Sequence, residues 1–146
     1  MWVKFPVWKG EVVAIKILKS LTISPEEVKE FKSEVKVMQK FKTHANVIKV
    51  FIFLVFFQIF FQFIDANMVT LNSLCIITEY CAKGALNKYL QTNQLSNSDI
   101  LQIMQGIAAG MRHLAKEKII HRDLAARNVL LANDLTPKVT EKYALK

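Results

Sequence analysis

The stretch His121–Asn128, with the sequence HRDLAARN, is the most informative part of this 146-residue chain. It lies between two apolar segments, Ile119–Ile120 and Val129–Leu131, and it gathers a histidine, two arginines, an aspartate and an asparagine. So many polar groups between buried segments must either hydrogen-bond to one another or serve a ligand. Asp123 can accept a proton from a hydroxyl group, and Asn128 can offer an oxygen to a hard cation such as Mg²⁺. A salt-bridged structural turn is the alternative.

A second pair of chemically informative residues lies upstream of this stretch. Val12–Leu18 is rich in β-branched residues and apolar on both faces, which predicts a buried strand that contains Lys16. A capping box and a first-turn proline after Ser24 predict a helix that runs to about Phe41. On this helix Glu34 falls within the apolar arc, where a carboxylate is costly unless a cation pairs with it. Lys16 is the natural partner; the alternative is an edge-strand lysine and a glutamate that bends out to water.

The remaining pattern predicts strands and helices in alternation. Leu74–Thr78 is predicted to be a buried strand and Ala85–Gln91 a short helix. Ser96 begins a longer predicted helix, and Ile119–Ile120 and Val129–Leu131 are predicted to be a hairpin-like pair of strands. The apolar face of the longer helix is predicted to comprise Ile100, Ile103, Met104, Ile107, Met111 and Leu114.

Charge and cysteine content exclude several classes of protein. The net charge is +8, but the 20 Lys and Arg residues form no block, which argues against a nucleic-acid-binding protein. The spacing of Cys75, Cys81 and the three histidines does not suit zinc, and free thiols are typical of the reducing cytoplasm. Met1–Pro6 lacks the pattern of a signal peptide. Nothing in the sequence indicates an oligomeric state.

The Phe-rich segment, Val50–Ile64, raises the apolar share of the chain to 52%, because 13 of its 15 residues are apolar. As a helix it would span roughly 22 Å, which is short of a hydrocarbon core of about 30 Å. As a single strand it is too long and is apolar on both faces. We therefore expect an insertion rather than a membrane segment, with membrane contact through residues 50–64 as the lesser alternative. Outside this segment the apolar share is ordinary for a soluble domain.

These features together resemble the protein kinase family. Val13–Lys16 is similar to the strand that carries the ATP-anchoring lysine, and Glu34 to its partner on the following helix. His121–Asn128 matches the catalytic loop at every defining position, and its LAARN portion is typical of tyrosine kinases and some tyrosine-kinase-like relatives. Ile76–Cys81 resembles the strand that leads into the hinge. The resemblance covers residues 8 to about 140, apart from the Phe-rich segment.

The resemblance implies an α+β, bilobal protein-kinase-like fold that is incomplete. Residues 1–146 would form one partial kinase domain. An N-lobe of about residues 1–80, with a sheet and helix C, would contain an insertion near 51–69. After the hinge, about residues 82–146 would begin the helical C-lobe.

The resemblance also implies an ATP- and Mg²⁺-dependent site. Lys16 would bind the α- and β-phosphates and be fixed by Glu34, and Asp123 would orient the acceptor hydroxyl with Arg127 beside it. Asn128 and Glu141, the latter at the position of the Asp-Phe-Gly aspartate, would hold Mg²⁺. Residues expected around the nucleotide are Val13, Ala14, Thr78 as the gatekeeper, Glu79 and Cys81 through their backbone groups, and Leu130.

Two departures from the family predict impaired activity. No G-x-G-x-x-G motif precedes Lys16, and Gly10 is the one glycine before it. Glu141, Lys142 and Tyr143 replace Asp-Phe-Gly, so the carboxylate is one methylene longer. Because the sequence ends at Lys146, we expect a kinase domain truncated at both ends, from a mispredicted gene model or a decayed copy.

We therefore expect a cytoplasmic protein kinase, or the cytoplasmic part of a larger signalling protein. It would transfer phosphate from ATP to a hydroxyl of a protein substrate, with tyrosine favoured over serine or threonine. The alternative function is a catalytically inactive, pseudokinase-like binding or scaffold module.

Overall fold

The chain forms two compact units in the computed structural model. The first comprises Met1–Val35 and Val50–Glu79, and the second comprises Lys36–Lys49 and Tyr80–Lys146. The predicted lobe boundary near residues 80–82 and the predicted insertion near 51–69 stay predictions. The structure describes residues 2–8, 10–18, 26, 29, 42–54, 74–140 and 144–145.

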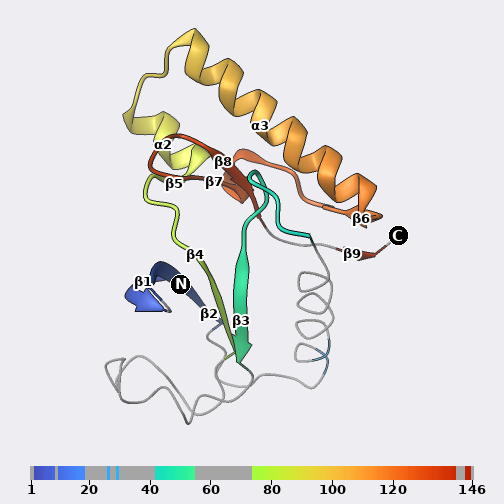
Figure 1. Cartoon of the computed structure of the whole chain (residues 1–146). Helices are drawn as coiled ribbons and strands as arrows, with labels where there is room; N and C mark the ends of the chain where they lie inside the picture. Colours follow the sequence, from blue (N-terminus) through green and yellow to red (C-terminus); the bar gives the residue numbers. More distant parts are fainter. Residues whose placement is uncertain are drawn as a thin grey trace. The chain divides into compact units, whose positions relative to one another are not determined.

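The first unit contains a four-stranded antiparallel sheet in the order β1-β2-β4-β3 (Figure 1). The two inner strands are the ones that the β-branched patterns predict, and Val13, Ile15, Ile76 and Ile77 are buried in them. The strands are β1 (Trp2–Trp8), β2 (Glu11–Leu18), β4 (Leu74–Glu79) and β3 (Val50–Leu54).

The two outer strands were not predicted. β1 joins β2 through a tight turn, in which Trp8 pairs with Glu11 and Gly10 adopts a φ of +87°. Glycine is favoured there because a Cβ is strained at positive φ. β3 consists of the first five residues of the Phe-rich segment and pairs with β4. The sequence pattern does not predict this strand, because the segment as a whole is too long for one strand. β3 comprises only its first five residues.

The second unit contains two helices and two small sheets. β5 (Gly84–Ala85), β7 (Val129–Leu131) and β8 (Pro137–Val139) form one sheet, in the order β5-β7-β8. β6 (Ile119–Ile120) pairs with β9 (Ala144–Leu145). The prediction that β6 and β7 pair as a hairpin is therefore wrong. β6 pairs with the distant strand β9, whereas β7 pairs with the following strand β8 and with the distant strand β5.

The helices α2 (Leu86–Thr92) and α3 (Asn97–Lys116) confirm two predicted elements. Ser96 caps α3 through a capping box, since its Oγ accepts a hydrogen bond from the Asp99 N–H at 3.1 Å and its own N–H donates to Asp99 Oδ2 at 3.1 Å. Of the predicted helix that ends near Phe41, Glu26 and Lys29 are described, and both are helical.

The predicted apolar face of α3 is only partly buried. Ile103 and Leu114 are buried and Ile107 and Met111 are packed beside them, but Ile100 and Met104 are 42% and 61% exposed. The buried stripe is narrower than the predicted arc and includes Gly110, where the helix approaches its neighbours closely.

Two clusters of buried side chains form the core of the second unit, and Ile107 packs against both. One consists of Val47, Leu114, Ile119 and Val139, and the other of Leu86, Ile103, Val129 and Leu131. The first cluster joins the segment before β3 to α3 and β8. In the part of the chain that the structure describes, no helix has both the length and the apolar character needed to cross a membrane.

Candidate active site

The loop between β6 and β7 carries two of the predicted catalytic residues, Asp123 and Arg127, and its backbone makes a sharp bend at Arg122. Arg122 adopts a φ of +61°, which is uncommon for a residue with a Cβ. The N–H of Asp123 donates to the carbonyl of His121 at 2.8 Å and also approaches His121 Nδ1 at 3.3 Å. The surrounding hydrogen bonds therefore hold the backbone in a conformation that is otherwise disfavoured, as is common at functional sites.

The carboxylate of Asp123 is bound through both of its oxygens. Oδ1 accepts a hydrogen bond from Arg127 Nη2 at 2.6 Å, and Oδ2 accepts one from Asn128 Nδ2 at 3.0 Å. The side chain of Asp123 is still 37% exposed. The carboxylate is thus oriented by its neighbours and remains accessible to a hydroxyl group from solution.

Asn128 lies at the end of the 3-10 helix η1 (Ala126–Asn128) and is buried. Its Nδ2 donates to the Asp123 carbonyl at 2.8 Å and to the Asp123 carboxylate, which fixes the orientation of the amide. Because Nδ2 makes these bonds, the amide oxygen is the atom that Asn128 can offer to a cation. An amide oxygen suits Mg²⁺, so this residue fits the predicted metal role.

His121 and Thr140 connect the loop to the end of β8. His121 Nε2 lies 2.8 Å from the carbonyl of Thr140, and a carbonyl only accepts, so Nε2 carries the hydrogen. The Thr140 N–H and Oγ1 both donate to the carbonyl of Asn128, at 2.9 and 3.2 Å. These bonds fix the residue immediately before Glu141. The sequence analysis missed Thr140, although its polar side chain after an apolar strand was a possible signal.

Four predicted nucleotide-binding residues lie together on the paired strands β2 and β4. Ala14 pairs with Thr78, and Val13 pairs with Glu79. Val13, Ala14 and Thr78 are buried, and Thr78 Oγ1 donates to the carbonyl of Glu79 at 3.1 Å. The structure thus brings this set together within the first unit.

Lys16 lies on β2, where it pairs with Trp2 and Ile76, but its side chain is outside the described part of the chain. Glu34 and Glu141 also lie outside the described residues. The Lys16–Glu34 ion pair and the metal role of Glu141 therefore stay predictions.

The other two predicted nucleotide-binding residues belong to the second unit. Cys81 is buried, and its carbonyl accepts a hydrogen bond from the Gly84 N–H at 3.1 Å. Leu130 is half-buried on β7 and pairs with Ala85 and Lys138. Over residues 2–8, 10–18, 42–54, 74–140 and the few others described, no group of three or more His, Cys, Asp and Glu side chains could hold a metal ion.

Comparison with known proteins decides the family. The family model described as protein tyrosine and serine/threonine kinase matches residues 4–142 of the chain. The chain belongs to this kinase family. The resemblance inferred from the sequence is therefore confirmed, as is the partial α+β kinase-like fold.

Curated relatives of this kinase chain include several ephrin type-B receptors. It is 35% identical to ephrin type-B receptor 4 of Homo sapiens over 140 residues, which cover 94% of the chain and 13% of the receptor. It is 36% identical to ephrin type-B receptor 2 of Gallus gallus over 141 residues, which cover 94% of the chain and 12% of the receptor. The kinase chain thus spans about an eighth of the length of these relatives.

Proposed function

We propose that this chain is part of a protein kinase that transfers the γ-phosphoryl group of ATP to a hydroxyl of a protein substrate, with tyrosine favoured and serine or threonine as the alternative. The observation that carries the proposal is the binding of the Asp123 carboxylate by Arg127 and Asn128. A carboxylate oriented in this way and partly exposed is suited to accept a hydrogen bond from the acceptor hydroxyl.

Asp123 would act as the catalytic base and positioning group. The acceptor oxygen forms a bond to the γ-phosphorus as the bond from that phosphorus to the ADP oxygen breaks, and the hydroxyl proton passes to Asp123. Since such a transition state is loose, positioning and charge neutralisation contribute more than base strength. The exposed guanidinium of Arg127 neutralises part of the carboxylate charge and keeps Asp123 in place.

ATP and Mg²⁺ are the cofactors that this proposal requires. Lys16 would bind the α- and β-phosphates and be oriented by Glu34, while Asn128 and Glu141 would hold Mg²⁺, which neutralises phosphate charge. Val13, Ala14 and Thr78 would surround the adenine. Three further residues are proposed to contribute to nucleotide binding: Glu79, Cys81 and Leu130.

We further propose that the activity of this chain is impaired. Glu141 is one methylene longer than the aspartate that the family has at this position, so its carboxylate would be displaced relative to the oxygen of Asn128. Mg²⁺ prefers near-ideal octahedral geometry, so a displaced ligand weakens its binding. Lys142 and Tyr143 also replace the phenylalanine and glycine that follow in the family.

The preference for tyrosine is supported by two observations. The loop contains the sequence LAARN between Leu124 and Asn128, with Arg127 bound to Asp123. Curated relatives that are 34–36% identical to the chain are ephrin type-B receptors, and the matching family model covers tyrosine as well as serine/threonine kinases.

A protein substrate is the expected partner, and a nucleic acid is not.

We propose a cytoplasmic location, alone or as the cytoplasmic part of a larger signalling protein. Membrane contact through residues 50–64 is the less favoured proposal.

The function can be tested with the purified chain, Mg·ATP and an equimolar mixture of tyrosine and serine peptides, with phosphate located by mass spectrometry. We expect slow transfer to the tyrosine hydroxyl that is lost in Asp123→Asn, a nearly isosteric change. Transfer to serine alone, or transfer that Asp123→Asn leaves unchanged, would overturn the assignment. Binding of ATP without any transfer would favour the alternative, a pseudokinase-like scaffold.

A further inference from the structure

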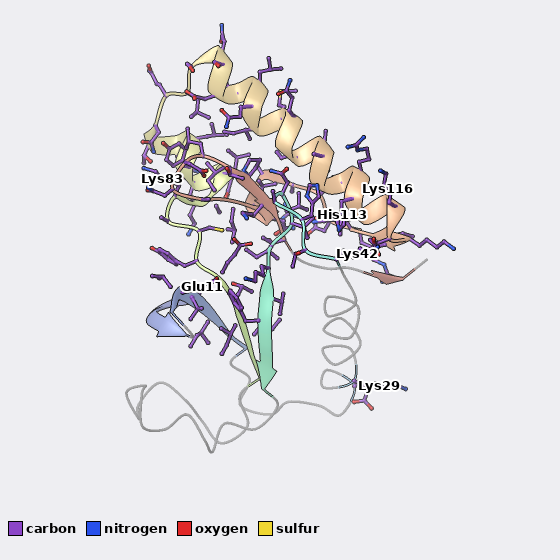
Figure 2. The ribbon with its side chains drawn as sticks, in the orientation of Figure 1. Glu11, Lys29, Lys42, Lys83, His113 and Lys116 are labelled. Carbon is purple, nitrogen blue, oxygen red and sulfur yellow. The ribbon has the colours of Figure 1, made fainter. Side chains whose placement is uncertain are left out.

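Two histidines from distant parts of the second unit stack on each other. His44 lies in the segment before β3 and His113 lies near the end of α3, with ring centroids 4.7 Å apart and an interplanar angle of 20°. His113 Nε2 lies 2.8 Å from the carbonyl of Lys42, and Figure 2 shows His113 on α3 beside Lys42. His44 Nδ1 lies 3.0 Å from the N–H of Asn46. The pair therefore fastens the segment 42–46 to α3.

The hydrogen bonds define the protonation state that this arrangement needs. A backbone N–H only donates, so His44 Nδ1 must be an unprotonated acceptor for the bond from Asn46. A carbonyl only accepts, so His113 donates its Nε2 hydrogen to Lys42. An imidazolium at His44 would have a hydrogen on both ring nitrogens and could not accept from Asn46. The stacked arrangement thus requires a neutral His44.

The charged groups around His44 also favour its neutral form. Burial, and then the neighbouring His113, Arg112 and Lys138, lower the pKa of His44 below 6.5. His113 and Arg112 lie on α3, Lys138 lies on β8, and Lys42 is a further cation in the segment of His44 itself. Since the folded-state pKa is the lower one, the stabilisation is complete above about pH 6.5 and is lost as the pH falls through the lowered pKa.

The segment that carries His44 is connected to the candidate active site through β8. Asn46 accepts a hydrogen bond from the Val139 N–H at 2.9 Å through its carbonyl, and its Nδ2 donates to the Pro137 carbonyl at 3.0 Å. The Ile48 N–H donates to the Val139 carbonyl at 3.0 Å. The next residue, Thr140, is the one that binds the carbonyl of Asn128 and the ring of His121.

We propose that His44 and His113 form an acid-sensitive latch. Neutral His44 holds the segment 42–48 against α3 and the end of β8, and protonation of His44 in mildly acidic solution releases it. Release removes the support of Asn46 for Val139 and loosens the attachment of Thr140 to the loop 121–128. The latch concerns the folded chain and does not depend on whether the chain transfers phosphate.

Amide hydrogen exchange of the 146-residue chain at pH 7.5 and pH 5.5, corrected for intrinsic rates, tests the latch. The protection of the Asn46 and Val139 amides is expected to fall severalfold at pH 5.5. This fall in protection cannot exceed about tenfold. At pH 5.5 a released imidazole with a pKa of 6.5 is about ten times more often protonated than neutral, and this ratio limits how far protonation favours the released state. His44→Asn is the matched variant, since an asparagine can accept from the N–H two residues on and does not titrate. Its protection is expected to be the same at both pH values.

A second measurement keeps the test decisive if His44→Asn does not fold. The ring protons of the three histidines can be followed by NMR from pH 5 to 8. In His113→Gln, whose amide can still donate to the Lys42 carbonyl but carries no charge, the midpoint of His44 is expected to rise toward 6.5. An unchanged midpoint in His113→Gln, or the same pH dependence in His44→Asn as in the natural chain, would overturn the proposal.

Discussion

Asp123 is bound by two side chains that differ greatly in exposure. The side chain of Arg127 is 61% exposed, so its ion pair with Asp123 is screened by water. Asn128 is 7% exposed and donates to both the carbonyl and the carboxylate of Asp123. A buried amide in this position contributes more to stability than an exposed ion pair, because its removal leaves acceptors without their partner. The shape of the loop therefore depends more on Asn128 than on Arg127.

The difference predicts unequal effects of two substitutions. Asn128→Ala is expected to lower the free energy of unfolding by about 1–3 kcal/mol, since it leaves the Asp123 carbonyl without its buried donor. Arg127→Ala, the matched control on the same carboxylate, is expected to lower it by about 1 kcal/mol or less. Urea unfolding at pH 7.5 measures both. Equal losses, or a larger loss for Arg127→Ala, would contradict this account of the loop.

The loop 121–128 could be singled out from the sequence as a candidate site because its polar residues are neighbours in the chain. The bonds that support it could not be predicted. His121 binds Thr140 across 19 positions, and Asn46 binds Pro137 across 91 positions. Neither pairing produces a local spacing that sequence analysis can detect, so Thr140 and Asn46 emerge only from the fold.

Helix α3 is the element that organises the second unit, and its beginning is defined by local chemistry. The Ser96 side chain accepts from Asp99 N–H, and the two side chains also contact each other at 2.6 Å. Ser96→Ala is expected to lower the free energy of unfolding by about 1 kcal/mol, because the first turn loses its capping acceptor. Ser98→Ala, in the exposed first turn, is the control and should change stability little. Urea unfolding followed by circular dichroism gives both values, and equal effects would count against the capping box.

The middle of α3 depends on close approach rather than on helix propensity. A Cβ at Gly110 would lie 2.5 Å from the carbonyl oxygen of Asn46, which is a backbone atom and cannot rotate away. Gly110→Ala is therefore expected to destabilise the chain by about 1–3 kcal/mol, although alanine favours a helix by about 1 kcal/mol over glycine. Gln105→Ala on the exposed face is the control, with little expected change in thermal unfolding. A stabilised Gly110→Ala would show that the segment 42–49 does not pack against α3 in this way.

Elements with strong local signals could be predicted from the sequence, and their pairing could not. The predictions of β2, β4, α2 and α3 are confirmed because each has a cap or a regular apolar pattern. The burial of Ile100 and Met104 and the pairing of β6 with β7 were predicted wrongly, because burial and strand partners depend on the packing of the whole unit. β6 pairs with the distant β9, and β7 pairs with the following strand β8 and with β5.

At the scale of the whole molecule, the family match runs through both compact units, over residues 4–142. Four of the predicted site residues, Lys16, Glu34, Asp123 and Asn128, are the types that the proposed mechanism needs. The departure at Glu141 lies one residue after Thr140, which the structure holds by three hydrogen bonds. We therefore propose a kinase chain in which the loop 121–128 is held by several hydrogen bonds and one proposed metal ligand, Glu141, is altered.

Binding of ATP to the purified chain, with and without Mg²⁺, tests this central claim most directly. We predict weak binding that Lys16→Ala abolishes and that Mg²⁺ strengthens only slightly. Glu141→Asp should strengthen binding in the presence of Mg²⁺ by roughly tenfold, which corresponds to about 1.4 kcal/mol, and should leave binding without Mg²⁺ unchanged. The account would be contradicted if Lys16→Ala bound ATP as well as the natural chain, or if the natural chain bound Mg·ATP tightly and Glu141→Asp made no difference.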